Sequence, residues 1–150
     1  MRLKYFDGLM GFVVGDAMGV PLEGRSREEL LKNPVTKMTG FGTHNVAEGT
    51  WSDDTSLMIA TIDSINSKNG IDYQDIALKF SSWKNRGSYT PFGEPVGMGR
   101  TCAEAIDNFD EAHDDPTTCG LKDFYSNGNG SLMRILPIAY YAIEKHLKDV

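Results

Sequence analysis

Apolar residues recur along the chain at intervals of three and four, the spacing that places side chains on one face of an α-helix. Four such stripes stand out: Leu3, Phe6, Met10 and Val13; Met58, Ile62 and Ile65; Tyr73, Ile76, Phe80 and Trp83; and Cys102, Ala105, Ile106 and Phe109. A fifth apolar run follows residue 131 and contains Pro137, which predicts a kinked helix or one that holds the proline in its first turns. The sequence has no useful length of strand-like alternation. The pattern therefore predicts an all-α fold.

Residues that start and end helices mark the boundaries of these segments. The second helix is expected over residues 52–67, and Asn69-Gly70 follow it as a left-handed stop. Asp72 supplies an acidic start for the third helix. Thr101 and Glu104 have the T-x-x-E spacing of a capping box and predict the start of the fourth helix. The order of these signals predicts helices separated by loops.

Three glycines, Gly8, Gly11 and Gly15, lie within or just beyond the first predicted helix, which spans about residues 3–14. Each glycine costs a helix about 1 kcal/mol relative to alanine. Their presence suggests that another backbone or a ligand approaches this helix closely, and tight packing alone explains them equally well.

Length and composition point to one globular domain. A chain of 150 residues can support a real hydrophobic core, and 40% apolar with 24% charged residues lie near globular averages. The net charge of −6 and the scattered basic residues argue against nucleic acid as the main partner. Cys102 and Cys119 have neither metal-ligand spacing nor the density of a disulfide scaffold, which favours a reduced, cytoplasmic setting. Arg2 and Lys4 imitate the start of a signal peptide, but Asp7 interrupts the segment, and we expect no membrane span.

The densest candidate chemistry lies at the start of the second predicted helix. Asp53 and Asp54 are adjacent there, and the hydroxyls of Ser52 and Thr55 flank them. Closely packed oxygen donors suit a divalent cation such as Mg²⁺ or Mn²⁺. Acids and hydroxyls are also ordinary helix-start residues, because they accept bonds from free N–H groups and complement the helix dipole. From the spacing alone, a metal site and a helix cap both remain open.

A second candidate is the glycine-rich turn at residues 127–131, which leads into the last apolar run. A turn of this kind at a helix N-terminus exposes backbone N–H groups and is a natural anion site. The same composition also ends strands and caps helices. The turn alone does not decide between these interpretations.

Four stretches of the chain carry a resemblance when they are taken in order. They are Gly15-Asp16-Ala17-Met18-Gly19-Val20-Pro21-Leu22-Glu23, Trp51-Ser52-Asp53-Asp54-Thr55, Gly97-Met98-Gly99-Arg100-Thr101 and Gly128-Asn129-Gly130-Ser131-Leu132-Met133-Arg134. Together they resemble the ADP-ribosylglycohydrolase family, which includes dinitrogenase reductase-activating glycohydrolases and ADP-ribosylarginine hydrolases. The first, second and fourth stretches are similar to the family patterns G-D-A-x-G-x-P-x-E, W-T-D-D-T and G-N-G-small-x-M-R, and the third is looser.

The resemblance implies a compact all-α fold with a cleft that holds two Mg²⁺ ions, or Mn²⁺ in some members. The metal ligands implied by motif are Ser52, in place of the usual threonine, Asp53, Asp54 and Glu23. The implied catalytic carboxylates are Glu23, Asp53 and Asp54. The implied substrate-binding residues, on loops that meet the diphosphate of ADP-ribose, are Gly97, Gly99, Asn129, Gly130 and Ser131. We expect Asp16 to be structural, tying the end of the first helix to a neighbour, and Arg134 to be a buried ion-pair partner.

The chain departs from the family pattern in one respect. Family members are much longer and carry, in their C-terminal half, a D-x-D-T motif that completes both metal sites; this sequence has none. We therefore expect residues 1–150 to form a single domain that is incomplete at its C-terminus. Apolar helix faces left exposed would favour self-association or a completing C-terminal segment. The isolated chain is expected to bind metal weakly and to hydrolyse little.

Two functions from different classes follow from the resemblance. The first is a metal-dependent hydrolase that cleaves the glycosidic bond between ADP-ribose and a modified protein side chain, arginine foremost, or a related ADP-ribose conjugate. The second is a non-catalytic ADP-ribose-binding or structural relative that lacks the full metal centre. The acceptor linkage and the identity of the general base stay open at this point.

Overall fold

The computed structural model describes residues 2–112 and 115–146, and within these ranges the chain is built from helices and loops. No strand occurs in them, although Phe41 and Val46 form an isolated antiparallel bridge. The prediction of an all-α fold is confirmed. The elements in chain order are α1 (Arg2–Gly19), η1 (Val20–Leu22), α2 (Arg27–Lys32), η2 (Gly42–His44), α3 (Asp53–Lys68), α4 (Tyr73–Arg86), α5 (Arg100–Ala112), η3 (Pro116–Thr118), η4 (Leu132–Arg134) and α6 (Leu136–Lys145).

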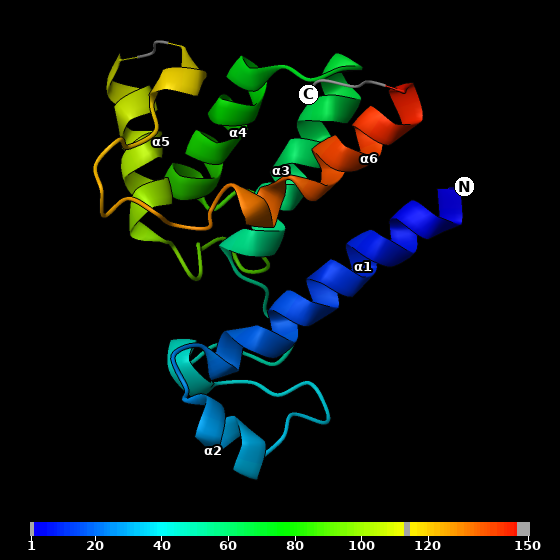
Figure 1. The fold of residues 1–150 in the computed structure, drawn as a ribbon, viewed down its shortest axis with the longest axis vertical. Coiled ribbons are helices and arrows are strands. Elements are labelled where there is room, and N and C mark those ends of the chain that lie inside the picture. Colours follow the sequence, from blue (N-terminus) through cyan, green and yellow to red (C-terminus); the bar gives the residue numbers. More distant parts are fainter. Residues whose placement is uncertain (1, 113–114, 147–150) are drawn as a thin grey trace.

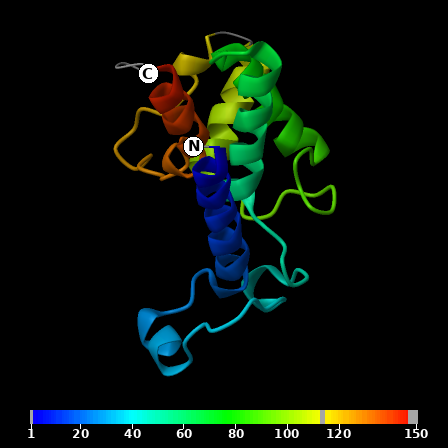
Figure 2. The same ribbon diagram turned by 90° about the vertical axis from the view of Figure 1, so that its right-hand side faces the viewer.

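The helices divide between a cluster and an extended arm. Within the cluster, α3 packs against α4 and α6, and α4 packs against α5 (Figure 1). α1 leads away from this cluster toward α2, and residues 20–50 form a lobe at its far end in both views (Figure 2). The chain then returns so that the start of α3 contacts the end of α1.

The hydrophobic core lies between α3, α4 and α5, with η4 on one side. Its buried members are Leu57, Ala60, Ile76, Phe80, Trp83, Cys102, Ile106 and Met133. Burial of each large apolar side chain contributes about 1.5–3 kcal/mol relative to exposure, so Trp83 and Leu57, which are fully buried, dominate this cluster. The third and fourth predicted stripes supply most of the core and are confirmed as packing faces, apart from the half-exposed Tyr73.

The buried face of α3 differs from the predicted stripe. Met58 is buried, but Ile62 and Ile65 are only partly buried. The stripe with almost no exposure is instead Leu57, Ala60, Thr61 and Ser64. The small side chains of Ala60, Thr61 and Ser64 allow neighbouring helices to approach α3 closely, which a count of apolar residues alone does not reveal.

The predicted stripe of α1 is wrong as a packing face at two of its members, while Val13 is partly buried and the side chain of Leu3 lies outside the described part of the structure. Phe6 is 61% exposed and Met10 is 42% exposed, whereas Phe12 packs against the core. The helix also continues past the predicted end at residue 14 to Gly19. No helix of the described residues, α1 included, is both long and apolar enough to cross a membrane.

The glycines of α1 have different surroundings. A β-carbon at Gly8 would lie 2.0 Å from the hydroxyl oxygen of Tyr140 on α6, so tight packing explains this glycine. A β-carbon at Gly11 or Gly15 would meet no described atom within 4 Å. Gly15 borders the cleft described below.

The predicted boundaries of α3 and α4 are confirmed. Ser52 caps α3 by accepting the Asp54 N–H on its hydroxyl oxygen at 3.2 Å, and Asn69 ends the helix in the left-handed conformation. Asp72 caps α4 by accepting the Asp75 N–H at 2.9 Å. Local hydrogen bonding therefore decides where both helices begin.

The capping box predicted for α5 is wrong. The helix already begins at Arg100, and the Gly99 carbonyl accepts the N–H of Ala103 at 3.0 Å. Thr101 therefore lies inside the first turn, and Glu104 pairs with Arg100 instead of with a helix cap. The predicted proline position in the last helix is confirmed, because Pro137 lies in the first turn of α6, where its missing N–H costs nothing.

Candidate functional site

A cleft of about 780 Å³ lies where the end of α1, the start of α3, the loop before α5 and the turn before η4 meet. Its lining residues are Gly15, Asp16, Gly19, Val20 and Glu23; Ser52, Asp53 and Asp54; Gly97, Gly99, Arg100, Thr101 and Cys102; and Tyr125, Asn127, Gly128, Asn129, Gly130 and Met133. The four sequence stretches therefore converge on one cavity. Among the predicted site residues, Ser131 is outside this lining and borders a second, more apolar cavity.

Asp16 joins the two helices that form one wall of the cleft. Its Oδ2 accepts the N–H groups of Ser52 at 3.0 Å and Thr55 at 3.1 Å, and its Oδ1 accepts the Ser52 hydroxyl at 2.7 Å. A carboxylate at this position satisfies free donors in the first turn of α3 and complements the positive end of its dipole. The expected structural role of Asp16 is thus confirmed.

Asp53 is held by the main chain of the loop before α5. Its N–H donates to the Val96 carbonyl at 2.8 Å, and the Gly99 N–H donates to its Oδ2 at 3.5 Å. Gly97 has a φ of +78°, and a β-carbon there would lie 2.9 Å from Asp53 Oδ1. Only glycine allows the backbone this close to the carboxylate.

The carboxylates of the cleft repel one another. Burial raises the pKa of Asp53 to about 6, and the neighbouring charge of Asp54 adds to the increase. Burial also raises the pKa of Asp54, followed by the charges of Asp16 and Glu23. The N-terminal turn of α3 therefore carries both a helix cap and a cluster of crowded negative charge, so the two interpretations of the acid pair do not exclude each other.

Glu23 reaches the cleft from the loop after η1 and has a partner that the sequence did not reveal. Its Oε2 contacts Nε2 of His44, and its backbone carbonyl accepts the Thr43 hydroxyl at 2.6 Å. Glycine at position 42 lets the segment with Thr43 and His44 lie against the segment with Glu23, because a β-carbon at Gly42 would lie 2.0 Å from the Pro21 carbonyl oxygen. The two residues lie 21 positions apart on separate loops, so no local sequence pattern indicates the pairing.

The glycine-rich turn packs against the start of α5. A β-carbon at Gly128 would lie 2.1 Å from the Thr101 hydroxyl oxygen, and one at Gly130 would lie 2.2 Å from the Cys102 sulfur. These close contacts place Asn129 on the cleft wall. Arg100, Tyr125 and Asn127 border the same cavity and were not predicted as site residues, although Arg100 and Asn127 lie within stretches that the sequence singled out; Tyr125 belongs to no local chemical pattern.

Arg134 is not the ion-pair partner that the sequence suggested. Its guanidinium lies over the Phe80 ring, 4.7 Å from the ring centroid, and donates to the Cys102 sulfur at 3.5 Å. In the part of the chain that the structure describes, it forms no ion pair. The cation therefore stacks on the core instead of pairing with an acid.

The family of the chain follows from comparison with known proteins. Residues 2–149 match the ADP-ribosylglycohydrolase family. The chain belongs to this family. This ADP-ribosylglycohydrolase chain is 33% identical over 133 residues to the ADP-ribosyl-dinitrogen reductase glycohydrolase of Rhodospirillum rubrum, and 29% identical over 139 residues to the ADP-ribosylarginine hydrolase Tri1 of Pseudomonas putida (strain GB-1). It also matches a solved ADP-ribosylglycohydrolase-related protein complex, with a TM-score of 0.68 and 28% identity.

The matches cover most of this ADP-ribosylglycohydrolase chain but a smaller share of its relatives. The aligned regions span 87% of the chain and 42% of the Rhodospirillum protein, and 89% of the chain and 34% of the Pseudomonas protein. The solved structure is matched over 87% of the chain and 40% of its own length. The chain thus spans roughly a third to two fifths of these relatives, which agrees with the expectation of a partial domain.

The donors in the cleft suit a hard divalent cation in kind but not in number. The predicted ligands Asp53, Asp54, Ser52 and Glu23 all border the cleft and all offer oxygen. Among the described residues, however, no group of three or more acidic, histidine or cysteine side chains has the arrangement to hold a metal ion. A metal at this site would need further ligands, and the ligand assignment stays a prediction.

Proposed function

We propose that this chain forms part of a hydrolase that releases ADP-ribose from a modified protein side chain, with ADP-ribosylarginine as the first substrate to test. One observation carries the proposal: Glu23 and the adjacent pair Asp53 and Asp54, which lies far from it in the sequence, border one cleft together with the glycine loops at residues 97–99 and 128–130. The names of two relatives, an ADP-ribosylarginine hydrolase and an ADP-ribosyl-dinitrogen reductase glycohydrolase, support this choice of substrate.

The charge of the cleft suits glycosidic cleavage. Breaking the bond at the ribose builds positive charge on the sugar, and nearby carboxylates stabilise that charge. Asp53 is fixed for this task by main-chain bonds to Val96 and Gly99, and Asp16 fixes the turn that carries it. Glu23 is more exposed, so it is placed to exchange a proton with water or with the leaving group.

A divalent ion would be held in part by Asp53 and Asp54, with Ser52 and Glu23 as further oxygen donors, and ligands from outside this set would have to complete its coordination. When bound, Mg²⁺ or Mn²⁺ would acidify a water molecule and orient the sugar hydroxyls. The diphosphate would lie against the wall formed by Gly97, Gly99, Asn129 and Gly130, where glycine allows close approach of the main chain. Remote binding of this kind positions the reacting carbon.

A second function is favoured by the incomplete donor set. If the described residues do not bind metal, the cleft still has the glycine wall of an ADP-ribose site. The chain would then be a non-catalytic ADP-ribose-binding relative. Calorimetry with ADP-ribose, with and without Mg²⁺, separates the two functions when it is combined with a release assay.

The release assay measures ADP-ribose set free from an arginine-modified protein. Slow Mg²⁺-dependent release that disappears in Asp53→Asn supports the hydrolase, and Asp110→Asn is the control, because Asp110 lies outside the cleft on α5, where its carboxylate accepts a bond from Asn85. ADP-ribose binding without release supports the non-catalytic relative. Neither binding nor release, from a chain that is shown to be folded, would refute both.

A further inference from the structure

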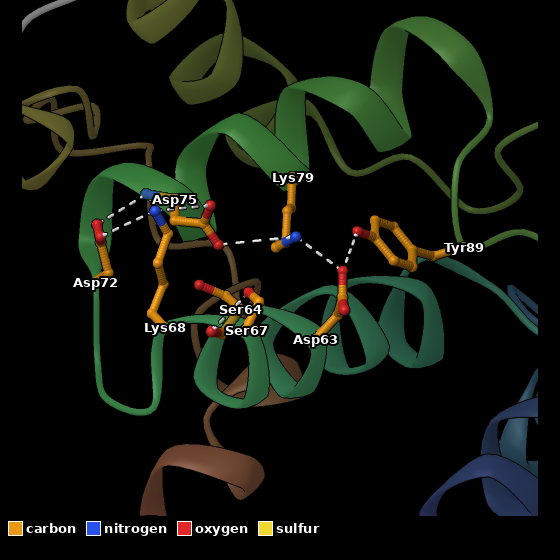
Figure 3. Close-up of polar contacts among 8 residues, drawn as sticks. All are labelled: Asp63, Ser64, Ser67, Lys68, Asp72, Asp75, Lys79 and Tyr89. Atoms are coloured by element: carbon orange, nitrogen blue, oxygen red, sulfur yellow. Dashed lines mark hydrogen bonds and ion pairs between the residues drawn. The ribbon is translucent and has the colours of Figure 1, made fainter.

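A polar cluster between α3 and α4 is connected through one tyrosine, Tyr89, to the segment that precedes α3. Asp63 on α3 accepts two bonds on the same oxygen, Oδ2: one from Lys79 Nζ on α4 at 2.8 Å and one from the Tyr89 hydroxyl at 2.7 Å (Figure 3). Lys79 also lies 3.7 Å from Asp75 (Figure 3). The Lys79 and Tyr89 bonds lower the pKa of Asp63, so the acceptor is an ionised carboxylate and both bonds are charge-assisted.

Tyr89 has a backbone conformation that a bulky residue rarely adopts. Its φ is +65°, in the left-handed region, and such a conformation persists only where the surroundings over-determine it. Three contacts do so here. The side chain packs against the hydrophobic core, the hydroxyl bonds to Asp63, and the backbone carbonyl accepts the indole N–H of Trp51 at 3.1 Å.

The partner of that carbonyl stands next to the cleft. Trp51 immediately precedes Ser52 and Asp53, the first residues of the α3 turn. The loop between α4 and α5, which contains Tyr89, also contacts the same turn further along, because the Val96 carbonyl accepts the Asp53 N–H. Tyr89 therefore lies near the start of a loop that also bonds to Asp53 at Val96.

We propose that Tyr89 is a positioning residue for the cleft: its hydroxyl, bonded to Asp63, fixes its carbonyl under Trp51 and so fixes the segment that carries Asp53. The consequence for ligands rests on the proposed function. The positioning itself does not, because it concerns contacts of the free chain.

The test uses the two tryptophans, Trp51 and Trp83, as separate probes in the ¹⁵N-labelled chain. Hydrogen exchange is measured at the Trp51 indole N–H and at the Asp53 amide, relative to amides in the middle of α4, in Tyr89→Phe and Lys79→Met. Loss of a hydrogen bond to a charged group is expected to speed exchange at both probes by about tenfold in Tyr89→Phe. Lys79→Met also removes a bond to Asp63 but leaves the tyrosine bond. The exchange rates of the two probes, relative to the α4 amides, are therefore expected to stay within about twofold of wild type.

A positioning role also predicts that the Trp51 indole resonance moves in Tyr89→Phe while the Trp83 resonance stays in place. Asp63→Ala removes the acceptor from the other side and should reproduce the pattern, which keeps the test available if Tyr89→Phe does not fold. The proposal is overturned if the Trp51 and Asp53 probes are unchanged in Tyr89→Phe. It is also overturned if Lys79→Met changes both probes equally, because an equal change would mean that the Asp63 contacts only stabilise the fold.

The ligand consequence is measured separately, by titration with Mg²⁺ alone. Weaker Mg²⁺ binding in Tyr89→Phe than in Lys79→Met supports the link to the cleft. An absence of Mg²⁺ binding in every variant, wild type included, would count against the metal site of the proposed function. It would leave the exchange result to decide the role of Tyr89.

Discussion

Asp16→Ala is expected to destabilise the fold more than any other single loss at the cleft wall. The carboxylate of Asp16 accepts three donors at the start of α3, two backbone N–H groups and the Ser52 hydroxyl. Alanine removes every acceptor atom at once. The N–H groups of Ser52 and Thr55 then lose their acceptor, although both residues are almost fully buried.

The size of the effect follows from the kinds of bond that are lost. Loss of a helix cap costs about 1 kcal/mol, and each hydrogen bond to a charged group contributes about 1.5–3 kcal/mol, although the three share one carboxylate and do not add fully. Relief of repulsion with Asp54 offsets part of the loss, and solvent screening keeps this contribution small because Asp54 is only partly buried. We expect a net loss of about 2–4 kcal/mol for Asp16→Ala.

Asp16→Asn provides the internal comparison. Its amide oxygen can keep both N–H bonds, and the Ser52 hydroxyl can turn to accept from the amide nitrogen, so only the charge is lost and the expected cost is about 1 kcal/mol. Urea unfolding followed by circular dichroism measures both variants, and Asp7→Ala, an exposed position on the same helix, should stay within about 0.5 kcal/mol of wild type. Equal stability of Asp16→Ala, Asp16→Asn and wild type would show that Asp16 does not hold α3.

Three further predictions concern the cleft and α1. Because the pKa of Asp53 is raised to about 6, the metal-free folded state binds this proton more tightly than the unfolded state does. The contribution of Asp53 to stability should therefore fall as pH rises from about 4 to about 6. Asp53→Asn should abolish roughly 1–3 kcal/mol of that fall in unfolding curves measured across this range. Gly97→Ala should cost more than about 1 kcal/mol in thermal unfolding, since φ is +78° and the new methyl would press on Asp53; an unchanged melting temperature would contradict the close approach. Gly8→Ala should destabilise the fold by about 1–3 kcal/mol through its clash with Tyr140, whereas Gly11→Ala, in open space, should stabilise it by up to about 1 kcal/mol. The reverse order in urea unfolding would disprove the packing of α1 on α6.

The sequence predicted those parts of the fold that local chemistry decides. The stripe of Ile76, Phe80 and Trp83 and the cap at Asp72 were enough to place α4, because both depend on residues within one or two turns of each other. The face that α3 buries could not be read in the same way. Ala60 and Ser64 are buried because neighbouring helices approach there, and that is a tertiary property.

The candidate site was predictable as a set of residues but not as a set of contacts. Motif order brought Glu23, Asp53 and Asp54 together correctly. The contact between Glu23 and His44 was missed because it joins loop residues with no periodic pattern between them. The stacking of Arg134 was missed for a related reason, since a cationic side chain in a sequence does not say whether an acid or an aromatic ring will meet it.

The contacts to Asp53 have a consequence for how this protein can change. They come from the peptide groups of Val96 and Gly99, so they do not depend on which side chain Val96 or the exposed Met98 carries. Mutation can therefore alter the outer surface of this loop without removing the restraint on the acid. Substitutions at residues 96 and 98 should therefore leave the position of Asp53 unchanged, while any side chain at residue 97 would press on it.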